Sequence, residues 1–205
     1  MYSTDICNIA LSSIGQGQID SIDEDSEAAR QCKLYYELTR KNLLSSFRWG
    51  FAERSEKLAL VDTTVPKWEF AYALPKKCLV VRQLYNKNGD IIETDESAKD
   101  DTYHEFQIAL MNESQRIIMA DIEDAWMDYT ADIENAELFD SSFAEALAHK
   151  LASHIAMPLS GSQNMAQSQY QLYQIAIQQA MYTSAIQNHH KPSYPTKYFD
   201  ARRQR

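Results

Sequence analysis

Five histidines are the side chains of this 205-residue sequence best suited to acid–base or metal chemistry near neutral pH. They are His104, His149, His154, His189 and His190. His149 and His154 lie five positions apart, which separates them by about 500° around a helix, so they do not face one ligand together. Glu145 and His149 lie four positions apart, which is typical of a contact on a helix surface and only weakly indicates a catalytic dyad.

Two acidic runs supply candidate carboxylate pairs. Asp121, Glu123, Asp124 and Asp128 have the residue types of a glycosidase pair or a calcium site, but the twelve-residue calcium loop and its required glycine are missing. The separation of two carboxylates decides glycosidase chemistry, and a sequence does not report it. The other run, residues 23–27, precedes a predicted helix, where carboxylates complement the positive end of the helix dipole. We expect both runs to be solvated.

Motifs for phosphate binding or nucleophilic catalysis are absent from the sequence. It contains no G-x-x-x-x-G-K-[ST], G-x-G-x-x-G or G-x-S-x-G motif. Cys7, Cys32 and Cys78 are odd in number and far apart in sequence, which favours buried thiols in a reducing cytosol over a zinc or redox site. We therefore expect no catalytic residue, no cofactor and no metal ligand. The first residues do not resemble a secretory signal, and no apolar run is long enough to predict a membrane span.

Apolar residues at helical spacing predict four helices, and these would position any functional site. The first covers residues 3–14, with Ser3 or Thr4 as its cap, and the second carries an apolar stripe over residues 28–47. The third starts near Asp140, with capping-box spacing between Ser142 and Glu145, and is expected to end at Pro158 and Gly161. The fourth runs over residues 162–188. Its stripe is Ala166, Tyr170, Tyr173, Ile177, Ala180 and Met181, and its other side is rich in glutamine (Gln167, Gln171, Gln174 and Gln178).

Alternating and β-branched segments predict strands between the second and third helices. They cover residues 67–72, 78–81 and 125–129, together with a hairpin formed by 104–110 and 116–120. The order of elements predicts an α+β fold: a four-helix bundle from residues 1–48 and 135–188, with a β-rich insertion at 49–134. Five aromatic residues are expected to anchor this insertion on the bundle: Trp49, Phe51, Trp68, Phe70 and Tyr72.

The charge is divided unevenly between the body and the C-terminal segment. The net charge is −9, and residues 189–205 carry five cations against one carboxylate, so the other 188 residues carry −13. An acidic body does not hold DNA through its phosphates, but it suits a path along which DNA slides. Residues 189–205 contain two prolines and are predicted to form an extended arm. Aromatic residues and arginines are common interface anchors, and the candidates in the arm are Tyr194, Tyr198, Phe199, Arg202 and Arg203.

A succession of motifs resembles one known family. It begins with A-L-S-S-I-G at residues 10–15, Y-x-x-T-R-x-x-L-L at 36–44 and F-R-W-G-F-A at 47–52. W-E-F-A-Y-A-L-P follows at 68–75. This order resembles the head-to-tail adaptors of tailed phages, the group that includes tail tubular protein A of short-tailed phages. The resemblance covers about residues 2–188. The family usually has an acidic residue, or an acid–basic pair, just before the position of Cys78, where this chain has Lys76 and Lys77.

The resemblance implies a structural protein of the phage neck rather than an enzyme. It implies a homo-oligomeric ring, usually of twelve copies, below the portal protein, which continues the DNA channel for ejection and attaches a downstream tail or nozzle protein. DNA would pass without specific binding. By resemblance, Tyr194, Tyr198, Phe199, Arg202 and Arg203 are expected to contact the portal. The protein would lie in the virion, and in the host cytoplasm during assembly, with no membrane partner.

Two other functions stay open at this point. The first is a tail-associated peptidoglycan hydrolase that acts during DNA entry, with its carboxylates among Asp121, Glu123 and Asp124. The second is a bacterial regulatory domain that binds another protein through the arm. Cleavage of purified cell wall would favour the first alternative, and a genomic neighbourhood without portal or tail genes would favour the second.

Overall fold

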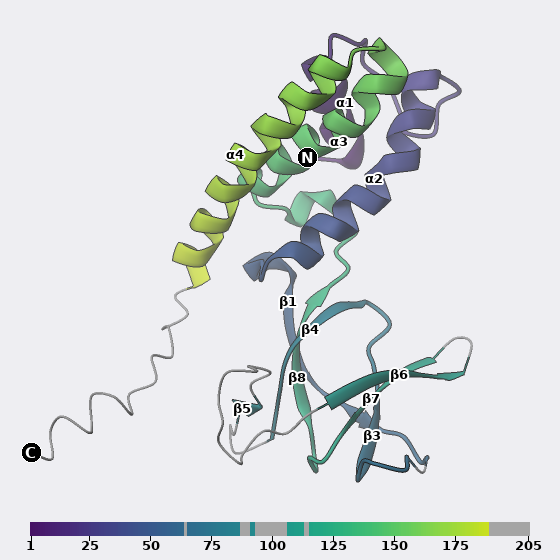
Figure 1. Cartoon of the computed structure of the whole chain (residues 1–205), viewed down its shortest axis with the longest axis vertical. Helices are drawn as coiled ribbons and strands as arrows, with labels where there is room; N and C mark the ends of the chain where they lie inside the picture. The colour runs from purple at the N-terminus through teal and green to yellow at the C-terminus, as the bar shows by residue number, and fades with distance from the viewer. Residues whose placement is uncertain (64, 87–90, 93–105, 113–114, 189–205) are drawn as a thin grey trace, which may run out of the picture.

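The computed structural model describes residues 1–63, 65–86, 91–92, 106–112 and 115–188. Helices gather at one end of the molecule and strands at the other (Figure 1). The helices are α1 (Ser3–Ser13), α2 (Glu27–Ser46), α3 (Ser141–Ser160) and α4 (Gln163–Asn188), with the short 3₁₀ helices η1 (Gly50–Ala52) and η2 (Ala136–Leu138). Four helices were predicted from the apolar spacing, and these segments are helical in the structure.

Local chemistry explains the start of α2 and the end of α3. The Ser26 hydroxyl accepts a hydrogen bond from the Ala29 amide at 3.1 Å and caps α2. Gly161 ends α3 in the left-handed conformation, with φ of 67°, which glycine adopts without a steric penalty. The predicted stop at Pro158 is wrong, because α3 continues through it to Ser160. The predicted capping box is also wrong: α3 begins at Ser141, one residue before the proposed cap Ser142.

Two antiparallel four-stranded sheets form the other half of the molecule. Their strands are β1 (Glu53–Lys57), β2 (Ala59–Leu60), β3 (Phe70–Ala73), β4 (Cys78–Tyr85), β5 (Ile91–Ile92), β6 (Phe106–Asn112), β7 (Gln115–Ala120) and β8 (Trp126–Ala131). The first sheet has the order β1-β8-β4-β5 and the second β2-β3-β7-β6. The predicted hairpin is present as β6 and β7, with Ile108 opposite Ile118.

The prediction of a four-helix bundle carrying an insertion is wrong, because the fold is mixed α+β. In a bundle, each helix would share a central core with two neighbours. Here α3 occupies the centre of the helical layer and packs against α1, α2 and α4. Small side chains allow this close approach, and five buried alanines of α3 provide them: Ala144, Ala146, Ala148, Ala152 and Ala156. Helices and strands also share one continuous core.

An aromatic cluster joins the helical layer to the β half. Trp49 is 1% exposed, and its ring lies edge-on to those of Phe47 and Phe143, at 5.2 and 5.0 Å between centroids. Its indole nitrogen donates a hydrogen bond to the Leu43 carbonyl at 2.9 Å. Phe51 packs on Phe143 from η1. The predicted anchoring role is therefore confirmed for Trp49 and Phe51.

The other predicted anchors lie deeper in the β half. Phe70 and Tyr72 stack within β3, with 6.3 Å between ring centroids, and the Tyr72 hydroxyl donates to the Ile122 carbonyl. Trp68 packs against a small separate cluster that contains Ala71 and Met119. These rings stabilise the sheets rather than the junction with the helices.

Two arginines tie α2 and its C-terminal end to the strands. Arg40 is fully buried and donates to Asp132 at 2.6 Å and to the Ile133 carbonyl at 2.5 Å. Its other guanidinium nitrogen lies 2.6 Å from the Glu37 carboxylate. Arg82 on β4 donates to the carbonyls of Ser45 and Phe47, at 3.1 and 2.6 Å. The end of α2 is thus held on the sheet by charge-assisted hydrogen bonds.

We expect His154 on α3 to make the stability of the fold depend on pH. Its ring stacks on Tyr35 of α2 with 5.4 Å between centroids, and burial, followed by the nearby Lys150 charge, lowers its pKa below the usual 6.5. The folded state therefore binds this proton more weakly than the unfolded state, so the contribution of the neutral ring is present above pH 6.5 and is lost below it.

We expect the free energy of unfolding to fall between about pH 7.5 and about pH 5.5, and to fall less steeply in His154→Gln. Urea unfolding at each pH measures both slopes. Equal slopes for the two proteins would contradict the role of His154.

Candidate functional site

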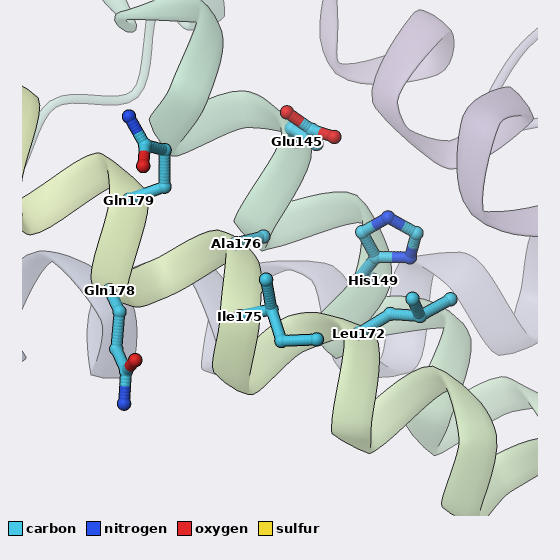
Figure 2. A pocket seen from close by; sticks show the side chains of 7 residues that line it. All are labelled: Glu145, His149, Leu172, Ile175, Ala176, Gln178 and Gln179. Atoms are coloured by element: carbon cyan, nitrogen blue, oxygen red, sulfur yellow. The ribbon is translucent and has the colours of Figure 1, made fainter.

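A groove lies between α3 and α4 on the outer side of the helical layer. It has a volume of about 450 Å³, and Figure 2 shows its lining side chains. Glu145 and His149 come from α3, and the residues from α4 are Leu172, Ile175, Ala176, Gln178 and Gln179. Among the described residues, no hydrogen bond or ion pair involves the Glu145 carboxylate. The groove therefore offers one carboxylate beside mainly apolar and amide side chains.

A buried glutamine fixes the position of His149. His149 Nδ1 lies 2.9 Å from Gln169 Oε1, and Gln169 Nε2 donates to the Ser13 carbonyl at 2.9 Å. The side-chain nitrogen of Gln169 donates to Ser13, so the side-chain oxygen of Gln169 accepts a hydrogen bond from His149. The hydrogen-bonding proton of the His149 ring is therefore on Nδ1. This network joins α4 to α3 and to the end of α1. It fixes His149 in the packing between the helices, and the hydrogen-bond partner of His149 is Gln169 rather than Glu145.

A lysine of α3, Lys150, lies against two aromatic rings of α4. Lys150 Nζ lies 4.4 Å from the centroid of the Tyr170 ring and 4.9 Å from that of Tyr173. Burial lowers the pKa of Lys150. The cation–π contacts stabilise its charge in place and fasten α4 to α3 along one side of the helix.

The outer face of α4 carries apolar side chains that no described element covers. Leu172, Ile175, Tyr182 and Ile186 are 43%, 68%, 64% and 50% exposed. Together with Gln179 they follow the alternating three- and four-residue spacing of the contact face of a coiled coil. We call this set the outer seam: Leu172, Ile175, Gln179, Tyr182 and Ile186. Leu172, Ile175 and Gln179 also form one wall of the groove.

The candidate carboxylates of the acidic run between β7 and β8 do not converge. Asp121 accepts a hydrogen bond from the Glu69 amide at 2.8 Å, and Asp124 lies 2.8 Å from Lys57. Asp128 is on β8 itself, where it pairs with Arg48 at 3.0 Å. Glu123 is exposed. Each of the three paired carboxylates thus has a structural partner, and the geometry gives no acid–base pair.

The structure brings together two cysteines that the sequence separates by 25 positions. Cys7 of α1 and Cys32 of α2 are both fully buried, and their side chains form a hydrogen bond. This bond and burial raise the pKa of the Cys7 thiol far above its usual value. Cys78 is buried separately, which raises its pKa to about 11. All three cysteines are free thiols buried in the core, and their burial agrees with the prediction from the sequence.

The five predicted portal-contact residues, Tyr194, Tyr198, Phe199, Arg202 and Arg203, lie outside the described residues. Within the part of the chain that the structure describes, no three histidine, cysteine, aspartate or glutamate side chains gather as a metal site requires. No described helix combines the length and the hydropathy that a membrane span requires.

The outer seam is not among the features predicted from the sequence. The predicted stripe of α4 is buried at Ile177 and Ala180, whereas the opposite side is predicted only to be rich in glutamine. The signal for a second face was present: over 26 residues, α4 contains no charged side chain. Solvated helix faces normally carry lysine and glutamate, so an uncharged exposed face indicates a contact surface.

No protein-family model matches this sequence, and no curated protein matches it.

Proposed function

We propose that this protein is a structural head-to-tail adaptor of a tailed phage. About twelve copies would close a ring below the portal, continue the DNA channel and attach the downstream tail or nozzle protein, without catalysis. The number of copies and the place in the virion follow from the family that the sequence resembles. The physical support comes from the surface of the molecule.

The observation that carries the proposal is the uncharged outer face of α4. A helix of 26 residues without a single charge, with four large apolar side chains exposed on its outer face, has the composition of an interface core. Such a surface favours association, because covering it removes apolar area from water, and the helix itself carries no charge that would lose its hydration. A subunit that works only in an assembly needs a surface of this kind.

The distribution of charge agrees with a channel. Residues 1–188 carry −13, so copies arranged around a hole would repel the phosphates of DNA rather than bind them. The arm carries a net charge of +4 and three aromatic residues, which suit a different partner with an acidic surface or with pockets for aromatic side chains. In the proposed assembly this partner is the portal ring.

Charge reversal in the arm tests the portal contact. In the full-length chain, we expect Arg202→Glu with Arg203→Glu to weaken binding to portal rings by roughly tenfold or more, because buried interface arginines each contribute about 1–2 kcal/mol. Co-sedimentation with portal rings measures this affinity. The matched control is Lys191→Glu with Lys197→Glu, which changes the charge equally and is expected to have a smaller effect. Unchanged binding by the first variant would contradict the assigned contact.

Zymography tests the alternative of a peptidoglycan hydrolase. We expect the purified protein to leave purified cell wall intact. Cleavage that is lost on changing Asp121, Glu123 or Asp124 would overturn the proposal of a purely structural role.

A further inference from the structure

We propose that Cys7 of α1 and Cys32 of α2 are a redox-active pair that closes to a disulfide when the protein meets a peroxide. The bond would link the first helix to the second across the core. The chemistry of the pair stands on the fold alone. Its timing rests on the proposed function, because a phage particle leaves the reducing host cytoplasm and meets an oxidising medium.

The contact between the two thiols is the observation that carries the inference. Both side chains are completely buried in one continuous core, and they hydrogen bond to each other although 25 positions separate them in sequence. Two cysteines form a disulfide without backbone movement only when their side chains already meet. The third cysteine, Cys78, is buried on β4 in the other half of the molecule and provides an internal comparison.

The hydrogen bond makes the two thiols unequal. The bond raises the pKa of Cys7, with burial as the next cause, and it lowers the pKa of Cys32, an effect that burial opposes. These directions correspond to the Cys7 thiol donating to the Cys32 sulfur. Cys32 therefore gives up its proton first, and the thiolate is the nucleophilic form of a cysteine.

The reaction with hydrogen peroxide balances without a further reactant. The Cys32 thiolate attacks one peroxide oxygen, the O–O bond breaks, and the leaving hydroxide takes up the proton that Cys32 released. The Cys7 sulfur then attacks the sulfenic acid formed on Cys32. The S–S bond forms, the S–O bond breaks, and the second hydroxide leaves as water with the Cys7 proton. The sulfurs are oxidised, and the peroxide is reduced to water.

A tyrosine hydroxyl close to the pair can assist the first step. Tyr36 lies one turn after Cys32 on α2 and is 3% exposed, and burial, followed by the charge of Cys7, raises its pKa. Among the described residues, this hydroxyl has no hydrogen-bond partner. A buried hydroxyl without a partner costs free energy, and a small polar molecule beside the thiols would satisfy it. We expect the hydroxyl to donate to the leaving hydroxide.

The disulfide would stabilise the helical layer. It closes the loop from Cys7 to Cys32, which contains the connector between α1 and α2. Closing a loop of this length restricts the unfolded chain and is expected to raise the ratio of folded to unfolded protein by roughly a hundredfold. Both thiols are buried, so peroxide reaches them through local opening of the helices, and the reaction is slower than at an exposed thiol.

Peptide mapping by mass spectrometry tests the pair in the purified, folded, full-length protein after treatment with hydrogen peroxide. We expect Cys7 joined to Cys32, with Cys78 still a free thiol. In Cys7→Ala, the sulfenic acid on Cys32 should accumulate and be trapped by dimedone. In Cys32→Ala, Cys7 is expected to react at least about tenfold more slowly, because its thiol is the poorer nucleophile. Tyr36→Phe should slow disulfide formation about fivefold.

Urea unfolding provides a second measurement with a matched control. The oxidised protein should unfold at a higher urea concentration than the reduced protein, and dithiothreitol should remove the difference. Cys78→Ala should show the same shift on oxidation, whereas Cys7→Ala should show none.

The outcomes separate the pair from the proposed function. Folded protein in which peroxide leaves Cys7 and Cys32 as thiols, or oxidises Cys78 first, would overturn the inference. A disulfide that forms only in urea-unfolded protein would also overturn it, because the bond would not depend on the contact. Rings on the portal without the disulfide would leave the adaptor function standing, and a disulfide in a chain that forms no ring would refute the adaptor function alone.

Discussion

Replacing Arg40 by methionine is expected to lower the free energy of unfolding by about 3–5 kcal/mol, because the change breaks a buried ion pair from one side. The Arg40 side chain is completely buried, whereas Asp132 is 14% exposed, so the carboxylate would lose its guanidinium partner with little access to water. The Ile133 carbonyl would lose a donor as well. Urea unfolding followed by circular dichroism measures the change.

An exposed arginine on the same helix provides the control. Arg30 pairs with Asp25 and Glu27, but its side chain is 57% exposed, and exposed ion pairs contribute about 0–1 kcal/mol. Arg30→Met should therefore change the free energy of unfolding by less than about 1 kcal/mol. Similar losses in the two variants would show that Arg40 is not the link between α2 and the strands.

Replacing Trp49 by alanine should destabilise the fold by about 3–5 kcal/mol, the usual cost of removing a large buried ring. Trp49 contacts Phe47, Phe51 and Phe143, so its loss would open a cavity where the helices meet the β half. The Leu43 carbonyl would also lose its indole donor. We expect the helical and sheet signals to unfold together at a lower urea concentration.

Truncation of an exposed residue separates this effect from a general loss of side-chain volume. Leu60 on β2 is 64% exposed, and Leu60→Ala should change the free energy of unfolding by about 0.5 kcal/mol or less. If Trp49→Ala were equally mild, the aromatic cluster would not be what joins the two halves.

Local patterns explain why the secondary structure was largely predictable. Each of α1, α2 and α4 has one buried stripe, and stripes at helical spacing are visible in a sequence. How the stripes combine is not visible, because the same stripe can face one neighbour or two. The alanines of α3 make it the central helix, and this depends on close approach to three partners at once. The predicted bundle therefore had its four helices in the correct segments of the sequence but packed them in the wrong arrangement.

Long-range contacts explain what was missed. Arg40 and Asp132 are 92 positions apart, and nothing in either neighbourhood identifies the other as its partner. Cys7 and Cys32 likewise meet only because α1 and α2 fold against the same core. The outer seam differs from these, because Leu172, Ile175, Tyr182 and Ile186 follow a regular spacing in an uncharged helix. A search for a second stripe would have found it.

Cryo-electron microscopy of the full-length protein mixed with portal rings tests the central claim most directly. The account predicts a closed ring of copies beneath the portal, with a central opening and the outer face of α4 of each copy covered in the assembly. Portal rings without added density at saturating protein, or copies bound singly around the portal without touching one another, would contradict it.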